Sequence, residues 1–198
     1  MHLRYNSDID EIIGKIGEVE AWFCSPCPHY KIDEAILRYA KNLRVIVTPS
    51  TGVTHIDTDY CVAQQIQLRT LKGTDAVEKI FASSEFTFTL ILAAVRNLYP
   101  ALKGVARKEW REYEDRYRGL ELNGRTLGVI GYGRIGRNIS RYGRGFGMKL
   151  VAHDPYVHIP AEHGVTACDM DEVLERADVL ALCVHLTSET RLMVNEKW

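Results

Sequence analysis

The sequence predicts an α/β protein built on a doubly wound parallel sheet, and three observations carry this prediction. A short apolar run at 126–130 leads into a glycine-rich hexapeptide at 131–136, and apolar residues then recur at helical spacing. A second apolar run at 149–153 ends in Asp154. Short apolar runs and amphipathic segments also alternate over residues 1–60, which favours parallel strands covered by helices.

The hexapeptide, Gly-Tyr-Gly-Arg-Ile-Gly, has the GxGxxG pattern of a Rossmann-type dinucleotide site. Gly131 would make the tight turn, Gly133 would let a pyrophosphate approach the backbone, and Gly136 would let the helix pack close to the strand. Free N–H groups at the helix N-terminus would then bind the diphosphate. The alternative is a glycine loop that serves only helix packing, and the flanking strand and helix patterns argue against it.

Asp154 lies close to the ~20-residue offset at which such sites carry an acid for the adenosine ribose. A carboxylate there can accept hydrogen bonds from both ribose hydroxyls and would repel a 2′-phosphate. The alternative is an ordinary aspartate at a strand end. The sequence thus predicts a dinucleotide site that favours NAD over NADP.

The first 60 residues alternate helix-like and strand-like pieces. We expect a helix ending at Gly17, a strand at 19–24, a helix at 32–40 and a strand at 43–47. The Cys-x-x-Cys pair Cys24 and Cys27 follows a predicted strand instead of opening a helix, and it has no second pair. We therefore interpret it as an inert turn rather than a redox or zinc motif.

Residues 48–57 follow a predicted strand directly and are rich in small and hydroxylated side chains. Backbone N–H groups around Gly52 could bind an anion such as a carboxylate. From composition alone, a plain surface turn is the favoured interpretation. His55, taken alone, is more typical of a structural or exposed histidine than of a catalytic one.

The middle of the chain predicts a long apolar helix at 85–99, capped by Ser83 or Ser84 and ended by Pro100. Because this helix is apolar all round, we expect it to be buried. The aromatic residues at 110, 113 and 117 lie among charges. They indicate either an arm that contacts a partner subunit or a linker helix whose aromatics pack on the core.

From Leu120 onward a second αβ series is expected. It comprises strands at 126–130, 149–153, 165–167 and 179–184, and helices at 135–146 and 170–177. In a doubly wound sheet, ligands bind beyond the carboxyl ends of the strands. His185 leaves the last of these strands, so it either lies near the cofactor or is an exposed loop histidine.

Bulk properties narrow the class of protein. The net charge of −1 gives no footprint for nucleic acid, and five cysteines without framework spacing suit a reducing compartment. The N-terminus has no apolar signal-peptide core, and the longest apolar run is far short of the ~20 residues that span a bilayer. We expect a cytoplasmic protein that binds neither membrane nor metal.

Several segments together resemble the D-isomer-specific 2-hydroxyacid dehydrogenases, a family that includes phosphoglycerate dehydrogenase and glyoxylate/hydroxypyruvate reductase. The segments that carry the resemblance are residues 50–57, 84–97, 119–128, 131–136, 146–148, 154–156 and 186–190. The resemblance implies a partial flavodoxin-like substrate domain at 1–95, a truncated NAD-binding Rossmann domain at 96–198, and a homodimer. The substrate would be a small 2-oxo or 2-hydroxy acid.

The resemblance also implies roles for single residues. Thr51 would approach the cofactor, and the amides of Gly52 and Val53 would hold the substrate carboxylate, which revises the surface-turn interpretation. The backbone of Arg134 and Ile135 would meet the pyrophosphate, together with the three glycines, and Asp154 would hold the ribose. Backbone contacts to the cofactor are further implied at Val184 and His185.

The sequence departs from the family in two places. Where the family often has His-x-Pro-Leu-Thr, this chain has Cys-Val-His-Leu-Thr at 183–187. The family's catalytic Arg, Glu and His would all lie downstream of residue 198, so no catalytic residue is assigned. We therefore expect an internal fragment of an NAD-dependent dehydrogenase that is inactive alone. The alternatives are a non-catalytic NAD-responsive binding protein of the same fold and a truncated pseudoenzyme.

Overall fold

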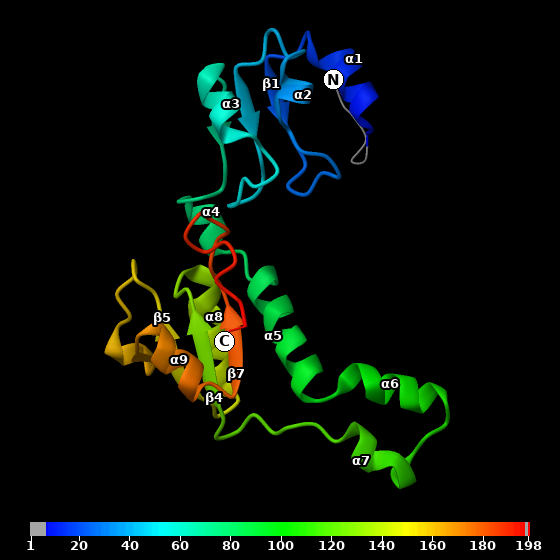
Figure 1. The fold of residues 1–198 in the computed structure, drawn as a ribbon, viewed down its shortest axis with the longest axis vertical. Coiled ribbons are helices and arrows are strands. Elements are labelled where there is room, and N and C mark those ends of the chain that lie inside the picture. The colour runs from blue at the N-terminus through cyan, green and yellow to red at the C-terminus, as the bar shows by residue number, and fades with distance from the viewer. Residues whose placement is uncertain (1–6, 197) are drawn as a thin grey trace. The chain divides into compact units, whose positions relative to one another are not determined.

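The computed structural model describes residues 7–196 and 198, and it divides into two compact units between Lys79 and Ile80 (Figure 1). The expected domain boundary lay between residues 95 and 96. The division falls earlier because helix α5 (Ala82–Val95) packs with the second unit, where Phe88 and Ile91 join the main core.

The first unit holds a parallel sheet in the order β1-β2-β3 within its described residues. Its elements are α1 (Ile9–Ile16), β1 (Ala21–Phe23), α2 (Glu34–Leu37), β2 (Val45–Val47), α3 (Thr58–Ala63), β3 (Gln67–Arg69) and α4 (Asp75–Glu78). Buried aliphatic side chains from α1, α2 and β2 form one core with Ile32 and Ile56. The expected helices and strands are present but shorter. Strand β3 was not predicted, because its two end residues are exposed and polar and the strand therefore has no apolar pattern.

The second unit holds a parallel sheet in the order β6-β5-β4-β7, which is the order 3-2-1-4 of the first four strands of a Rossmann fold. Its helices are α5, α6 (Leu98–Ala106), η1 (Arg111–Tyr113), α7 (Glu114–Tyr117), α8 (Arg134–Gly145), η2 (Ala161–His163) and α9 (Met170–Arg176). Its strands are β4 (Thr126–Ile130), β5 (Lys149–His153), β6 (Thr166–Ala167) and β7 (Val179–Leu182). The predicted doubly wound sheet is thus confirmed.

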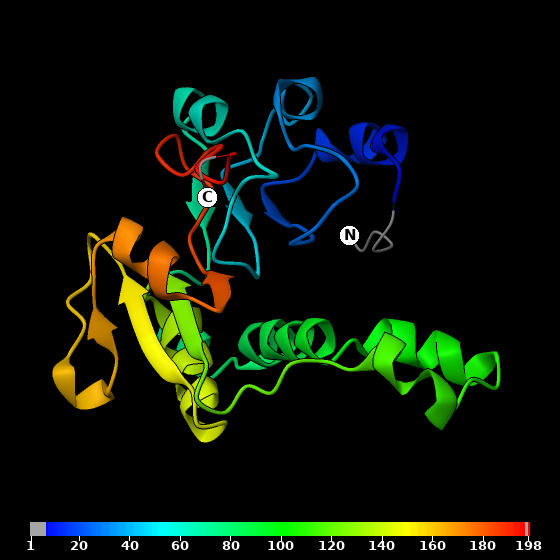
Figure 2. The same ribbon diagram turned by 60° about the horizontal axis from the view of Figure 1, so that its bottom comes forward.

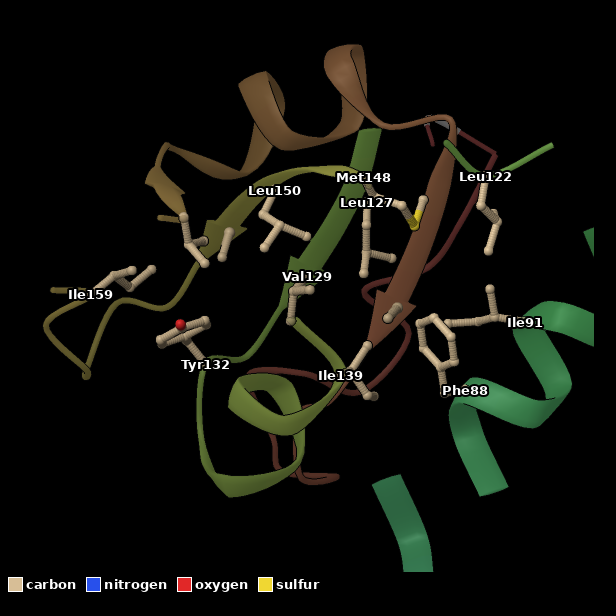
Figure 3. Packing of buried hydrophobic residues seen from close by; sticks show 13 residues of the cluster. Phe88, Ile91, Leu122, Leu127, Val129, Tyr132, Ile139, Met148, Leu150 and Ile159 are labelled. Carbon is tan, nitrogen blue, oxygen red and sulfur yellow. The ribbon is translucent and has the colours of Figure 1, made fainter. Parts of the chain in front are cut away.

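Helices cover both faces of this sheet. Successive side chains of β4 point to opposite faces, and apolar side chains of β4 are buried on each face. Leu127 and Val129 point into a core shared with Ile139 of α8 and Phe88 of α5 (Figure 3). Ile130 belongs to a second cluster on α9. The site-bearing loops therefore leave a strand that is packed on both sides.

Three expectations about helix α5 were wrong. Ser84 lies inside the helix instead of capping it, because the helix begins after Phe81, and the Ser84 side chain is fully buried. The helix is not buried all round, since Phe86 and Leu90 are 65% and 53% exposed. Pro100 does not end it: the break comes at Asn97, which has a left-handed φ of 49°.

Pro100 instead occupies the first turn of α6, where the missing N–H removes no helical hydrogen bond. Helix α6, η1 and α7 form a hairpin beyond the end of α5, here called the arm (residues 98–119) (Figures 1 and 2). Trp110 in this arm is 68% exposed, so it does not pack on the core. Within the described residues, no helix is both long and apolar enough to cross a membrane.

Candidate functional site

The turn after β4 is shaped by two glycines that no other residue can replace without movement. Gly131 has a φ of +90°, and a Cβ there would lie 2.9 Å from the carbonyl carbon of Cys183. A Cβ at Gly136 would lie 2.2 Å from the carbonyl oxygen of Gly131. The first glycine therefore allows the turn and its contact with the chain after β7, and the third lets α8 pack against the turn.

Gly133, the second glycine, is different, because a Cβ there would meet no protein atom within 4 Å. It is the N-cap of α8, and no side chain caps this helix. Among the described residues, the N–H groups of Gly133, Arg134 and Ile135 have no hydrogen-bond acceptor. These free donors and the positive end of the helix dipole suit the binding of an anion.

The side chains of the two residues after Gly133 point elsewhere. The Arg134 guanidinium donates to the backbone carbonyl of Ile80, and Ile135 packs against the main core of the unit. What these residues offer to a ligand is therefore their backbone N–H groups.

Asp154 follows β5 directly, and backbone N–H groups hold its carboxylate. Oδ2 accepts from the N–H of Tyr132 at 2.7 Å, which ties Asp154 to the glycine turn. Oδ1 accepts from the N–H groups of Tyr156 and Val157 at 2.9 and 3.1 Å. The half-buried carboxylate is thus fixed beside the N-terminal turn of α8 at the carboxyl edge of the sheet.

The chain after β7 borders the same turn. β7 ends at Leu182, two residues before the predicted end, and Cys183 N–H donates to the carbonyl of Ile130 at 2.7 Å. The Val184 Cγ1 lies 2.9 Å from the Cβ position of Gly131. His185 is exposed, and its carbonyl accepts from the Thr190 hydroxyl at 2.5 Å.

Burial raises the pKa of the Cys183 thiol to about 11. This thiol stands where the family motif has histidine, and it stays protonated and uncharged near neutral pH.

Two side-chain contacts near Asp154 were missed by sequence reasoning. The hydroxyl of the buried Tyr132 lies 3.2 Å from His163 Nδ1, and the hydroxyl of the exposed Tyr156 donates to Glu189. Each contact joins loops that are far apart in the sequence, so no local pattern could have indicated it. The first contact ties the glycine turn after β4 to η2, and the second ties the loop after β5 to the turn after β7.

In the first unit, the loop after β2 presents free backbone donors. Among the described residues, the N–H groups of Gly52 and Val53 have no acceptor. The hydroxyl of Ser50 donates to the Gly52 carbonyl at 2.7 Å, and Thr51 is half-buried beside it. This arrangement suits an anion better than the plain turn that composition favoured.

The predicted site residues therefore fall into two groups. The three glycines and Asp154 lie together with Val184 and His185 at the carboxyl edge of the β4–β5–β7 sheet. Thr51, Gly52 and Val53 follow β2 in the other unit. The Cys-x-x-Cys pair lies in an irregular loop after β1, as predicted, with Cys24 buried and Cys27 exposed.

A parallel sheet in Rossmann order with uncapped α8 amides and a fixed carboxylate after the next strand defines a dinucleotide-binding α/β domain. Sequence comparison gives the family. Residues 88–198 match the profile of the D-isomer specific 2-hydroxyacid dehydrogenase NAD binding domain, and residues 1–108 match the catalytic domain of that family. The chain belongs to the D-isomer specific 2-hydroxyacid dehydrogenases, and NAD is the cofactor of this domain.

Different relatives of this chain are named for different activities. The chain is 36% identical over 174 residues to D-3-phosphoglycerate dehydrogenase of Methanocaldococcus jannaschii, covering 84% of this chain and 31% of the relative. It is 31% identical over 195 residues to glyoxylate reductase of Thermococcus litoralis, covering 94% of this chain and 56% of the relative.

A solved D-lactate dehydrogenase of Aquifex aeolicus with NAD and lactic acid superposes with a TM-score of 0.80 at 32% identity. The match covers 93% of this chain and 54% of that structure. The chain thus spans about a third to a little over half of the length of these relatives.

Proposed function

We propose that this chain forms the NAD-binding and carboxylate-binding parts of a dehydrogenase that acts on the CH–OH group of a D-2-hydroxy acid. The observation that carries the proposal is the carboxylate of Asp154, held by the N–H of Tyr132 beside the free amides of α8. A dinucleotide needs an anion site and a ribose acceptor at this spacing.

Each group then has a defined task. The N–H groups of Gly133, Arg134 and Ile135 bind the pyrophosphate. The lone pairs of Asp154 that the backbone does not use accept from the adenine ribose, and its negative charge disfavours a 2′-phosphate. Backbone atoms of Val184 and His185 contact the cofactor along the same edge.

On the substrate side, the N–H groups of Gly52 and Val53 hold the carboxylate and Thr51 approaches the cofactor. Bound NAD supplies the hydride acceptor. The chain's contribution is to orient the two reactants, and the acid–base group and the group that polarises the carbonyl come from the part of the family sequence beyond residue 198.

The ribose assignment is tested by one substitution and two control substitutions. Asp154→Ala should weaken NAD binding by tenfold or more, because it removes a charged hydrogen-bond partner worth about 1.5–3 kcal/mol. Asp171→Ala removes an exposed aspartate of α9, and it should leave NAD affinity within twofold, as should Thr166→Ala. Isothermal titration of each variant with NAD and with NADP measures the two affinities. Equal losses in the three variants would exclude Asp154 as the ribose ligand.

We further propose that the chain forms a homodimer through α5 and the arm. Exposed apolar side chains recur at helical spacing on both elements: Phe86, Leu90, Leu98, Leu102 and Val105, with Tyr99 and Trp110 nearby. Apolar helix faces rich in aromatic residues are typical of subunit interfaces. A second copy of the chain would cover them, because isologous contacts let one apolar patch bury itself against its own equivalent.

The dimer is tested with two exposed valines on helices of different units. Val105→Glu, on α6, should shift the chain from dimer to monomer in sedimentation equilibrium, because a charge would be buried without a partner. Val62→Glu, on α3, makes the same chemical change at a side chain that is 77% exposed, and it should not alter the mass. A wild-type chain that sediments as a monomer would contradict the proposal.

We propose a cytoplasmic or other reducing location as well. All five cysteines are free, and neither Cys24 nor Cys27 forms a disulfide despite their closeness in sequence. Disulfides are rare where thiol buffers keep cysteines reduced. Thiol counting on the protein taken from its source cell would reveal any oxidised pair and so refute this location.

A further inference from the structure

We propose that His55, Thr48 and Ser50 form a hydrogen-bond chain that positions the peptide between Gly52 and Val53 for the substrate carboxylate. This inference rests on the carboxylate site proposed above. It goes further by assigning positioning residues behind that site, none of which needs to touch the substrate.

The three hydrogen bonds follow one another without a gap from His55 to the Gly52 carbonyl. Ser50 Oγ donates to the carbonyl oxygen of Gly52 at 2.7 Å. Thr48 Oγ1 lies 2.9 Å from Ser50 Oγ and 3.3 Å from His55 Nε2. Thr48, at its centre, is 1% exposed, whereas Ser50, Gly52 and His55 are half-buried.

Counting protons fixes the direction of every bond in the chain. The single hydroxyl proton of Ser50 goes to the Gly52 carbonyl, so Ser50 Oγ must accept from Thr48. The proton of Thr48 is then used, so His55 Nε2 must be the donor to Thr48 Oγ1. The proposed series of hydrogen bonds therefore requires the imidazole to carry its proton on Nε2.

The same bonds fix the peptide plane of the carboxylate site. In a trans peptide the C=O and the following N–H point in opposite directions. Holding the Gly52 carbonyl toward Ser50 therefore turns the Val53 N–H away from Ser50, as a free donor.

The rest of the loop is anchored as well. The carbonyl of Ser50 accepts from Leu71 N–H at 2.9 Å, and the carbonyl of Val53 accepts from Ile56 N–H at 2.9 Å. Two peptides lie between these anchors, and the Ser50 hydroxyl governs the orientation of the second, which joins Gly52 to Val53.

The test follows the backbone amides of Gly52 and Val53 by NMR in chain 1–198 while glyoxylate is added. Glyoxylate has the carboxylate and oxo group of the proposed substrate class and no side chain. Ser50→Ala should raise its dissociation constant about threefold to tenfold, the range expected for one hydrogen bond. Ser50→Thr keeps a hydroxyl and should restore binding to within twofold. Thr54→Ala, at an exposed hydroxyl of the same loop, is the matched control.

A second readout is the tautomer of the His55 ring. The ¹⁵N shifts of the neutral His55 ring in the wild-type chain should show the proton on Nε2, and Thr48→Val, which keeps shape but removes the hydroxyl, should weaken that preference. A His55 ring with its proton on Nδ1 would refute the proposed series of hydrogen bonds.

The outcomes separate this inference from the function on which it rests. If glyoxylate moves neither the Gly52 nor the Val53 amide in the wild type, the carboxylate site itself is refuted. If it moves them with equal affinity in Ser50→Ala and wild type, the site stands and the positioning role is refuted. NAD affinity should stay within twofold in all of these variants, because none of them changes Thr51 or the residues of the other unit that are assigned to the cofactor.

Discussion

Gly133 and Gly136 stand three positions apart in the same turn, yet a methyl group would meet different surroundings at each. At Gly136 it would collide with the Gly131 carbonyl, whereas at Gly133 it would meet no protein atom. Gly136 therefore serves the packing of the protein, and we propose that Gly133 serves the approach of a ligand. This distinction separates a folding role from a binding role within one motif.

We expect Gly136→Ala to lower the free energy of unfolding by about 1–3 kcal/mol, because the backbone must shift to admit the methyl group. Gly133→Ala should leave the unfolding free energy within about 0.5 kcal/mol. Its φ of −72° suits any residue. Its NAD affinity should nonetheless fall at least tenfold. Urea unfolding and NAD titration of both variants measure these quantities. A stable Gly133→Ala chain with unchanged NAD affinity would show that the pyrophosphate does not bind at this turn.

Residues whose role depends on the backbone could be predicted from the sequence. The positions of Gly131 and Asp154 could be predicted from local spacing, because a strand, a turn and the next strand set them. Thr48 and His55 could not be predicted in this way. Their contact depends on how the loop after β2 folds back, and a lone histidine near a hydroxyl has no distinctive pattern.

Among the elements, the junction between α5 and α6 holds the arm at its base. Asn97 adopts a left-handed conformation, and its side-chain amide donates to the Arg118 carbonyl at 3.0 Å. Leu120 N–H donates to the Val95 carbonyl beside it. The two ends of the arm are therefore fastened to each other through one side chain and one backbone bond.

Two substitutions at Asn97 separate backbone strain from the lost side-chain bond. Asn97→Gly tolerates the positive φ but loses the bond to Arg118, and it should lower the unfolding free energy by about 1 kcal/mol. Asn97→Ala loses the bond and adds left-handed strain, for a total of about 2–3 kcal/mol. Chemical unfolding monitored by circular dichroism gives both values. Equal effects of the two variants would show that the conformation of this junction contributes nothing.

Element positions were easier to predict than element ends. The strands before the glycine turn and before Asp154 match their predicted bounds, because each is a buried apolar run. The start of α5 and the place of Pro100 were wrong, because Ser84 is buried against Asn138 and the helix break is set by Asn97. Those choices depend on tertiary contacts that composition does not reveal.

At the scale of the whole molecule, the chain divides the proposed reaction between two units. The second unit offers the cofactor edge of a Rossmann sheet, and the first offers free amides for a carboxylate. Both are binding devices, since neither loop contributes a group assigned to proton transfer.

Residues 1–198 expressed alone should therefore bind NAD but consume no NADH with glyoxylate, hydroxypyruvate or 3-phosphohydroxypyruvate. Orientation without a proton donor leaves the alkoxide that forms on hydride transfer unstabilised, and general acid catalysis typically contributes about 10²–10⁴-fold in rate. Absorbance at 340 nm follows the reaction, and Asp154→Ala serves as the control for any contaminating dehydrogenase. NADH consumption that rises with the amount of chain and disappears in Asp154→Ala would place a complete catalytic apparatus within these residues. Turnover by the longer protein, with none by the chain, would assign the chemistry to the downstream segment; a longer protein that binds NAD without turnover would favour the NAD-responsive binding role instead.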